Sequence, residues 1–313
     1  MPLSLHAQDT GPGRDDPSVP TDKNIVLRLQ IFLDNHLFGP GKLDGAIGEF
    51  TYKAVVNYNY ANGHRDLYNW THAITAAEQE VPVIFAAFKI RPELLKFVDP
   101  LLPEDPAEQV NFPAMAYRSL AELIAERFHT DETFLALINP QKKLAALHVG
   151  DLVVVPNVRS FRIEDVKPMK SFPADPELEA HTIVVDTTER MAAFYGGDER
   201  MLAAFPITPG KPEFIPIGTW AVKTIMTTPS FRYDKQFLEA GVRGAEAYQL
   251  PPGPNSPVGI LWCGLTKSGI GLHGTAQPRT IGRARSAGCV RLANWDAIRL
   301  PQLVRPGSKV IVR

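Results

Sequence analysis

Hydrophobic residues in the first half of the chain recur at helical spacing in several short stretches. The spacing places them on one face of a helix and predicts helices over 23–38, 50–58, 120–128 and 134–138. The stretch 152–157, which is apolar up to Pro156, predicts a strand after the last of these helices. Pairs of such short helices enclose little core, so the first half is expected to consist of small modules.

The second half of the chain shows the pattern of strands instead. Short apolar runs separated by turn residues predict strands over 181–186, 191–195, 203–208, 218–224, 258–265 and 309–312. Many short strands with few helices favour a mostly β sandwich or barrel. The stretch 229–256 breaks this pattern and contains several aromatic residues. We expect it to form a lid or a wall beside a substrate site.

Polar and proline-rich stretches divide the chain into several expected parts. Residues 1–22 read as a disordered tail or as the remnant of a signal peptide, in which Ala7 suits a cleavage site although the apolar segment is missing. The expected order is a tail over 1–22, a small α-helical module over 23–64, an irregular connector with a strand over 65–112, a small α+β module over 113–158, a linker over 159–180 and a β-sandwich domain over 181–313.

The composition is that of an ordinary globular protein. The 313 residues are 44% hydrophobic and 21% charged, and the formal net charge is −1. Because nucleic-acid-binding proteins usually carry an excess of basic residues, we expect no nucleic-acid partner. No apolar run approaches the roughly 18 residues of a membrane-spanning helix, so no transmembrane segment is expected. The sequence does not indicate the oligomeric state.

A histidine, a cysteine and several glycines lie close together near the C-terminus. His273 precedes Cys289 by 16 positions, Gly288 comes directly before the cysteine, and Arg291 follows it. Acyl transfer to a thiol uses a thiolate nucleophile, an imidazole that takes and returns the proton, and backbone N–H groups that hold the oxyanion. A nearby imidazole can form a thiolate–imidazolium pair, and Arg291 adds positive charge. Gly288 permits a sharp turn that exposes the sulfur.

The residues around this pair resemble a known signature. The stretch 273–275 reads His-Gly-Thr, and the stretch 286–291 reads Ser-Ala-Gly-Cys-Val-Arg. Together with the proline-rich approach over 250–259, this order resembles the L,D-transpeptidase catalytic domain of the YkuD type, over roughly 180–313. The resemblance implies a β-sandwich with the cysteine loop at one edge of a cleft. It also implies a reaction that needs no metal or organic cofactor.

The resemblance assigns roles by position. Cys289 would be the nucleophile and His273 the general base and then the general acid, with the backbone carbonyl of Gly274 as the third member of the catalytic group. Ser286 and Arg291 would shape the loop and its electrostatics, and the N–H groups of Gly288 and Cys289 would bind the oxyanion. Many relatives carry His or Asn where this chain has Ala287, which removes one polar contact to the substrate.

Four further residues near the motif have expected roles. Trp262, Tyr248 and Tyr233 are candidates for substrate binding. Cys263 lies in a strand-like run and reads as a buried small hydrophobic residue. A structural disulfide between Cys263 and Cys289 would block the nucleophile and is not expected, whereas a reversible redox pair between them is a hypothesis.

Two more resemblances concern the first half of the chain. The order Leu-Gln, Pro-Gly, Asp-Gly and Ala-Val over 29–55 resembles a peptidoglycan-binding type 1 module, and a helical spacer without a ligand is the alternative. The order of strand, helix, helix and strand over 117–156, with turns at Asn139-Pro140 and Gly150-Asp151, resembles a LysM module that binds glycans containing N-acetylglucosamine. A scaffold without a ligand is the alternative there.

The resemblance implies a peptidoglycan L,D-transpeptidase of the periplasm or cell envelope. Its partners would be peptidoglycan stem peptides and glycan strands. Cys289 would form a thioester with release of D-Ala, and an acceptor amine would resolve it into a 3→3 cross-link. Water as acceptor would make the protein an L,D-carboxypeptidase, and an inactive domain would make it a wall-binding protein. A papain-type peptidase is not expected, because only 24 residues follow Cys289 and none is a histidine.

Overall fold

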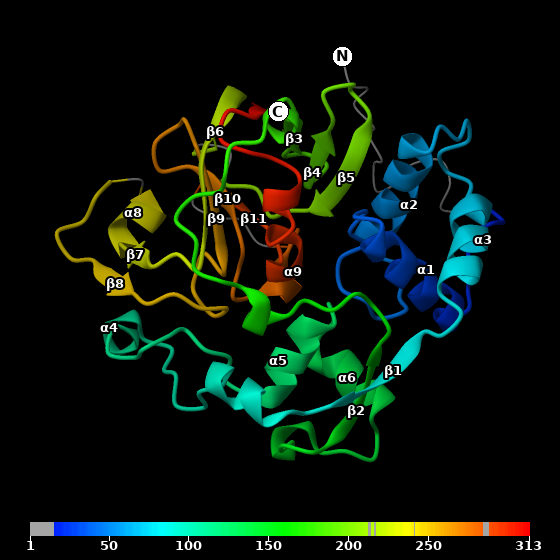
Figure 1. Ribbon diagram of the computed structural model, residues 1–313, viewed down its shortest axis with the longest axis horizontal. Coiled ribbons are helices and arrows are strands. Elements are labelled where there is room, and N and C mark those ends of the chain that lie inside the picture. Colours follow the sequence, from blue (N-terminus) through cyan, green and yellow to red (C-terminus); the bar gives the residue numbers. More distant parts are fainter. Residues whose placement is uncertain (1–15, 212–213, 216, 241, 284–287) are drawn as a thin grey trace.

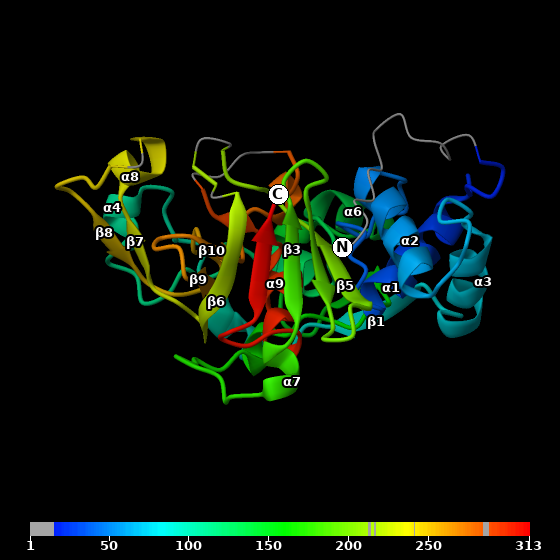
Figure 2. The same ribbon diagram turned by 90° about the horizontal axis from the view of Figure 1, so that it is seen from above.

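The computed structural model describes residues 16–211, 214–215, 217–240, 242–283 and 288–313. Figures 1 and 2 show the arrangement of the elements along the long axis of the molecule. The helices of residues 23–80 lie at one end, the large sheet lies in the middle, and an extension formed by residues 231–250 lies at the other end. Most of the tail expected over 1–22 lies outside the described residues.

The N-terminal region consists of three helices. These are α1 (Lys23–Asn35), α2 (Glu49–Ala61) and α3 (Thr71–Glu80). The carboxylate of Asp22 accepts two hydrogen bonds from the first turn of α1 and fixes its start. The sequence predicts α1 and α2 but not α3. The reason is that only Ala73 and Ala77 of α3 are buried, so its apolar face is too small to produce a clear periodicity.

The second region pairs two strands that are distant in sequence. Its elements are β1 (Phe85–Lys89), the 3₁₀ turn η1 (Pro92–Phe97), α4 (Pro106–Gln109), α5 (Leu120–Arg127), α6 (Glu132–Ile138), the 3₁₀ turn η2 (Leu144–Ala146) and β2 (Leu152–Pro156). β1 and β2 are antiparallel. The side chains of Ser119 and Asp131 cap α5 and α6. The partner of β2 therefore comes from the stretch that was expected to be a connector.

The C-terminal region is mostly β, as the sequence predicts, and its strands form one curled sheet. The strands are β3 (Thr182–Asp186), β4 (Met191–Tyr195), β5 (Met201–Pro206), β6 (Gly218–Thr227), β9 (Leu261–Leu265), β10 (Gly271–His273), β11 (Val290–Arg291) and β12 (Lys309–Val312). Their order is β11-β10-β9-β6-β12-β3-β4-β5. β6 pairs with β12 along its first half and with β9 along its second half, so it joins the two halves of the sheet. Local periodicity predicts the strands, but it does not predict that β6 pairs with both β12 and β9.

Short elements complete this region. They are η3 (Ile163–Asp165), α7 (Pro176–Glu179), η4 (Pro278–Thr280), α9 (Asn294–Ala297) and η5 (Leu300–Gln302). The stretch 229–256 folds into β7 (Phe231–Tyr233), α8 (Lys235–Ala240) and β8 (Tyr248–Leu250), with β7 and β8 antiparallel. Figure 1 shows this extension beside the sheet, with α4 below β8, and α4 and β8 are in contact.

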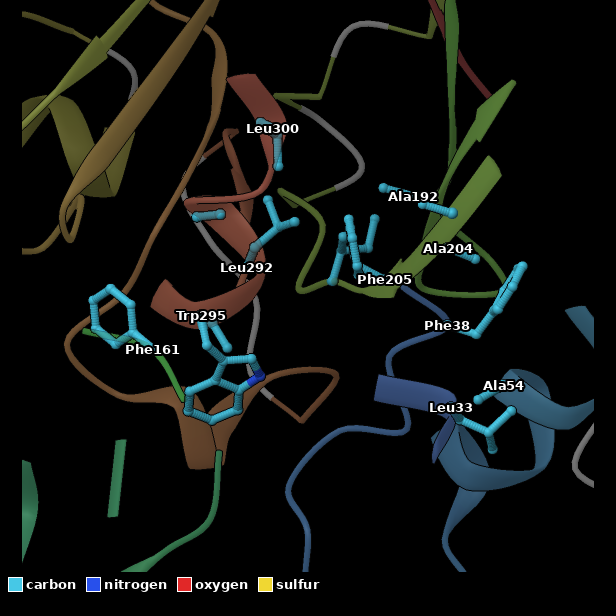
Figure 3. Close-up of a cluster of buried hydrophobic side chains, with 14 of the residues drawn as sticks. Leu33, Phe38, Ala54, Phe161, Ala192, Ala204, Phe205, Leu292, Trp295 and Leu300 are labelled. Atoms are coloured by element: carbon cyan, nitrogen blue, oxygen red, sulfur yellow. The ribbon is translucent and has the colours of Figure 1, made fainter. Parts of the chain in front are cut away.

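One continuous hydrophobic core runs through the N-terminal helices, the second region and the large sheet. Figure 3 shows Leu33 of α1, Phe205 of β5 and Trp295 of α9 within one buried cluster. Phe161, from the stretch expected to be a linker, belongs to the same cluster and is buried. Because burial of apolar surface is the main favourable term in folding, this shared core fixes the N-terminal helices against the sheet.

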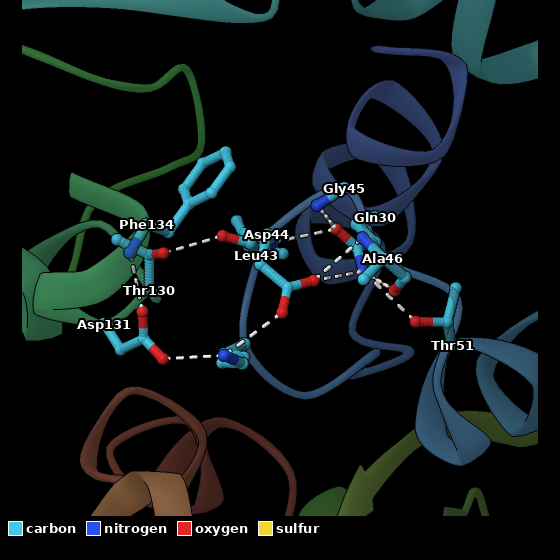
Figure 4. A network of polar contacts seen from close by, with 10 residues as sticks. Gln30, Leu43, Asp44, Gly45, Ala46, Thr51, Thr130, Asp131 and Phe134 are labelled. Atoms are coloured by element: carbon cyan, nitrogen blue, oxygen red, sulfur yellow. Dashed lines mark hydrogen bonds and ion pairs between the residues drawn. The ribbon is translucent and has the colours of Figure 1, made fainter. Parts of the chain in front are cut away.

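Polar contacts reinforce the same junction. Figure 4 shows the loop after α1, where the side-chain carbonyl of Gln30 accepts two backbone hydrogen bonds and shapes the turn. The carbonyl of Leu43 accepts a hydrogen bond of 2.7 Å from the Thr130 hydroxyl. Lys42 pairs with Asp131 at 2.6 Å. The loop is thereby attached to the start of α6.

A buried ionic cluster lies at the centre of the junction. Arg299 contacts Asp34 of α1 at 2.6 Å and Asp296 of α9 at 3.2 Å. His129 contacts Asp34 at 3.0 Å and stacks on Trp295. Burial alone would raise the pKa of Asp34, but Arg299 and His129 hold it well below its usual range. Burial, with the nearby Asp34 charge, raises the pKa of Asp296 to about 8.

Replacing Arg299 with alanine is expected to lower the free energy of unfolding by about 3–5 kcal/mol, because it leaves two buried carboxyl groups without their cation. Urea unfolding followed by circular dichroism measures the effect. Arg91→Ala is the matched control, because Arg91 forms partly exposed ion pairs and should change stability by less than about 1 kcal/mol. Equal losses in the two variants would contradict the structural role of the cluster.

Candidate active site

The candidate nucleophile and base lie on neighbouring strands at one edge of the sheet. His273 of β10 pairs with Trp262 of β9 and with Arg291 of β11. Residues that pair directly across strands project from the same face, so these three side chains form one row. Cys289 directly precedes β11, and the same register places it beside Gly271, two residues before His273. The fold therefore puts the cysteine and the histidine on one face.

Two glycines make room in this row for an indole ring. A Cβ on Gly271 would lie 2.9 Å from the Trp262 ring, and a Cβ on Gly264 would lie 2.7 Å from its Nε1. The Trp262 and His273 rings stack with centroids 5.6 Å apart and planes 19° from parallel. Trp262, expected to bind substrate, thus packs directly against the candidate base.

The histidine is held in one tautomer. Its Nδ1 lies 2.6 Å from the carbonyl oxygen of Gly274, which requires a proton on Nδ1 and leaves Nε2 as an acceptor. Burial, reinforced by the charge of Arg291, lowers the pKa of His273 to about 4 although the Gly274 carbonyl opposes the shift. The imidazole is therefore neutral at physiological pH and able to accept a proton.

The cysteine is a thiol in the resting site. Cys289 is half-buried, and its Sγ lies 3.5 Å from the carbonyl oxygen of Gly269. Burial raises the pKa of Cys289 to about 11, although a hydrogen bond from the Gly271 backbone and the charge of Arg291 both lower it. A thiolate–imidazolium pair is therefore disfavoured before substrate binds, which differs from the sequence-based expectation.

The backbone of Gly288, directly before the cysteine, lies very close to another segment of the chain. Gly288 has φ +147°, a backbone conformation that residues with a side chain rarely adopt. A Cβ on Gly210 would overlap the backbone of Gly288. Thr208 exchanges two backbone hydrogen bonds of 2.9 Å with Arg291. Thr208 and Gly210 are not predicted from the sequence, where a Thr-Pro-Gly turn at 208–210 is their only signal. Ser286 and Ala287 lie outside the described residues.

A cavity of about 650 Å³ opens beside this row. Arg291 and Thr275 line it on the catalytic side, and Tyr233 lines it from the extension. Tyr248 pairs with Tyr233 across β7 and β8. The second region also contributes to the wall, and its residues include Tyr117, Arg118, Glu122 and Glu126. Sequence reasoning did not place this region at the site, because its contacts with the sheet are remote in sequence.

The second cysteine lies on the opposite face of the sheet. Cys263 follows Trp262 in β9 and pairs with Leu272, so its side chain points into the core. It is fully buried, and burial raises its pKa to about 12. The hypothesis of a redox pair between Cys263 and Cys289 is therefore wrong, because the two side chains project from opposite faces of the sheet.

Alkylation of Cys289 by iodoacetamide is expected to accelerate about tenfold for each pH unit from neutral to about pH 10, without a neutral plateau. The reactive species is the thiolate, and the pKa of Cys289 is about 11. Intact mass measured over time gives the rate at each pH. Buried Cys263 serves as the internal control, because a folded chain should take up one label only. A plateau between about pH 6 and 8 would instead indicate a preformed ion pair.

Two features do not occur in the part of the chain that the structure describes. Its histidine, cysteine and acidic side chains form no group of three or more that could hold a metal ion. Among the same residues, every helix is too short or too polar to cross a membrane.

Comparisons with known proteins agree on the C-terminal region. Residues 180–312 match the family described as the L,D-transpeptidase catalytic domain, YkuD. The YkuD protein of Bacillus licheniformis is 26% identical over 191 residues, which is 61% of this chain and 92% of that protein. The YqjB protein of Bacillus subtilis is 26% identical over 146 residues, which is 45% of this chain and 72% of that protein. Both carry names of L,D-transpeptidases.

Solved structures give similar matches. An L,D-transpeptidase from Mycobacterium smegmatis is 24% identical with a TM-score of 0.34, and the match covers 43% of this chain and 58% of that one. L,D-transpeptidase 3 from Mycobacterium tuberculosis is 17% identical with a TM-score of 0.35, and the match covers 54% of this chain and 76% of that one.

Proposed function

We propose that this chain, which carries a YkuD-type L,D-transpeptidase catalytic domain over residues 180–312, cross-links peptidoglycan through a thioester on Cys289. One observation carries the proposal. Within the matched segment, His273 is held by the Gly274 carbonyl with its Nε2 available as an acceptor, on the same face as Cys289. This is the arrangement that a nucleophile and its base need.

The proposed reaction has two half-reactions. Cys289 Sγ attacks the carbonyl between the third residue of a tetrapeptide stem and its terminal D-Ala, and His273 Nε2 takes the thiol proton. The C–N bond then breaks, and the D-Ala amine leaves with that proton. The side-chain amine of an acceptor stem attacks the thioester, releases Cys289 and forms the 3→3 cross-link. Because both resting groups are neutral, the proton moves as the sulfur attacks.

Water in place of the acceptor amine would give an L,D-carboxypeptidase through the same thioester. The cavity of about 650 Å³, which Arg291 and Thr275 line beside the catalytic row, has room for a peptide, and we prefer the transpeptidase for this reason. The oxyanion would accept hydrogen bonds from the N–H groups of Gly288 and Cys289, and Ser286 would support the loop that carries Cys289.

The N-terminal regions are proposed to bind the glycan strands of the same polymer. A helical peptidoglycan-binding module and a LysM-like module would raise the local concentration of stems at Cys289. An enzyme with this substrate would act outside the cytoplasmic membrane, in the periplasm or cell envelope. Binding of insoluble peptidoglycan by the full chain, measured by co-sedimentation, tests this part separately from catalysis.

Intact-protein mass spectrometry tests the proposal directly. The protein is incubated with a disaccharide-tetrapeptide, and the products are analysed with and without an acceptor stem. A Cys289 adduct and a cross-linked dimer are expected. An adduct that yields only the tripeptide would establish the carboxypeptidase instead. The absence of any adduct under reducing conditions would leave a wall-binding protein.

A further inference from the structure

The carbonyl group that orients His273 is held from behind by one buried side chain. Asn294 at the start of α9 is fully buried and lies against Gly274 and Gly259, where a Cβ on either glycine would overlap its Oδ1. The same Oδ1 accepts a hydrogen bond of 3.2 Å from the N–H of Ile260. The amide of Asn294 thus fills the space between the two glycines and fixes the Gly274 peptide.

The other end of this amide reaches the second region of the molecule. Asn294 Nδ2 donates to Oε1 of Glu126 at 2.9 Å and to the carbonyl of Pro254 at 3.2 Å. Glu126 lies in α5 and is only 6% exposed. Its Oε2 accepts a hydrogen bond from the hydroxyl of Tyr117. A chain of direct contacts therefore runs from Glu126 through Asn294 to the peptide that holds His273.

The carboxyl group of Glu126 selects the orientation of the Asn294 amide. The two ends of an amide are similar in size, but the nitrogen donates and the oxygen accepts. Oε1 of Glu126 accepts, so the NH₂ group faces it and Oδ1 faces Ile260 and Gly274. A reversed amide would place two acceptors against each other and leave the Ile260 N–H without its partner.

This selection does not require Glu126 to be charged. Burial, assisted by Glu122, raises the pKa of Glu126 to about 8, although hydrogen bonds from Tyr117 and Asn294 oppose the shift. In the neutral acid the proton on Oε2 can point to the oxygen of Tyr117, while Oε1 still accepts from Asn294. Glutamine has the same pattern, with a carbonyl for Asn294 and an NH₂ group for Tyr117.

We propose that Glu126 and Asn294 are positioning residues that hold the Gly274 carbonyl where it fixes the tautomer and orientation of His273. The consequence for turnover rests on the proposed function, because the oriented Nε2 is the base for Cys289. The proposal gives α5, which precedes the matched segment 180–312, a direct role in the catalytic centre. The catalytic domain is then incomplete without the second region.

The test compares variants that break the contact with one that keeps it. Glu126→Leu and Asn294→Ala are each expected to slow acylation of Cys289 by a tetrapeptide by about 10–100-fold, the cost of a small misplacement of a catalytic group. Glu126→Gln should stay close to the wild type. The double variant Glu126→Leu/Asn294→Ala should be no slower than the slower single variant, because both changes break the same link.

The deciding readout is the ¹⁵N NMR spectrum of the His273 imidazole, which reports its tautomer. The wild type and Glu126→Gln should show the Nδ1–H form, and Glu126→Leu or Asn294→Ala should show a mixture. Glu164→Gln is the matched control. Glu164 forms a buried ion pair of 2.9 Å with Arg127, which follows Glu126 in α5. The substitution weakens this pair, so it should change the stability of the protein but not the spectrum of His273.

The outcomes separate this proposal from the proposed function. A wild-type tautomer in either folded single variant, or an equal change in Glu126→Gln, would overturn the positioning role. If the wild-type enzyme forms no acyl adduct, the proposed function fails, but the spectrum still decides whether Glu126 and Asn294 hold His273. Either single variant suffices, so a failure of one to fold does not remove the test.

Discussion

Replacing Cys289 with alanine is expected to abolish the thioester and to lower turnover by at least about 10³-fold, while the fold is retained. Cys289 is half-buried at the edge of the sheet, so the loss of one sulfur should cost little stability. Intact mass after incubation with a disaccharide-tetrapeptide measures the adduct, and far-ultraviolet circular dichroism checks the fold.

Cys263→Ala is the matched control for this variant. It removes the other cysteine of the chain, whose side chain lies in the core on the opposite face of the sheet. It should lower stability slightly and leave adduct formation at the wild-type rate. Retained turnover in Cys289→Ala, or a loss of the adduct in Cys263→Ala alone, would contradict the assignment of the nucleophile.

Replacing His273 with alanine is expected to slow acylation by about 10²–10⁴-fold, the range that general acid–base catalysis contributes. The effect should be large because burial raises the pKa of Cys289 to about 11 and the site therefore depends on a proton acceptor. Single-turnover mass spectrometry with the tetrapeptide measures the rate constant. As pH rises towards 11, the variant should regain part of its rate, because the thiolate then forms without a base.

His181→Ala is the appropriate comparison. His181 is also buried, and its Nδ1 lies 2.7 Å from a backbone carbonyl, that of Leu303, outside the catalytic row. Its loss should change stability and leave the rate constant of acylation near the wild-type value. If His273→Ala acylates at full speed at neutral pH, another group is the base and the proposed mechanism is wrong.

Local patterns in the sequence predict much of the fold. The strands β3, β4 and β12 lie where apolar runs and alternation indicate them, because β3 and β4 are buried along most of their length and every second residue of β12 is buried. The helix α3 is not predicted, since it buries two alanines only. The curled sheet is not predicted either, because the double pairing of β6 depends on strands far along the chain.

Some residues of the candidate site can also be predicted from the sequence, and others cannot. Cys289, His273 and Gly288 belong to one short motif and are visible in the sequence. Gly210 is not, because a glycine in a turn does not reveal that its backbone contacts Gly288. Glu126 reads as one charge on an amphipathic helix, and only the fold shows that it meets a residue 168 positions later.

The pKa shifts of the site cannot be predicted from the sequence either. A cysteine near a histidine and Arg291 suggests a lowered thiol pKa, whereas burial raises it to about 11. Desolvation exceeds the attraction of the nearby charge in this case. The burial of Cys289 depends on the pairing of β11 with β10 and of β10 with β9, and this pairing is not encoded in local spacing.

The close packing of the second region against the C-terminal region has a consequence for the evolution of the chain. A Cβ on Gly253 would overlap the backbone of Met115, and the Asn255 side chain donates to the carbonyl of Ala116 at 2.8 Å. Modules on flexible tethers can be exchanged by recombination, because neither side loses contacts. Here a foreign second region would have to reproduce both the backbone fit at Gly253 and a carboxyl group for Asn294. We expect the regions of this chain to have diversified together, with substitutions on one side compensated on the other.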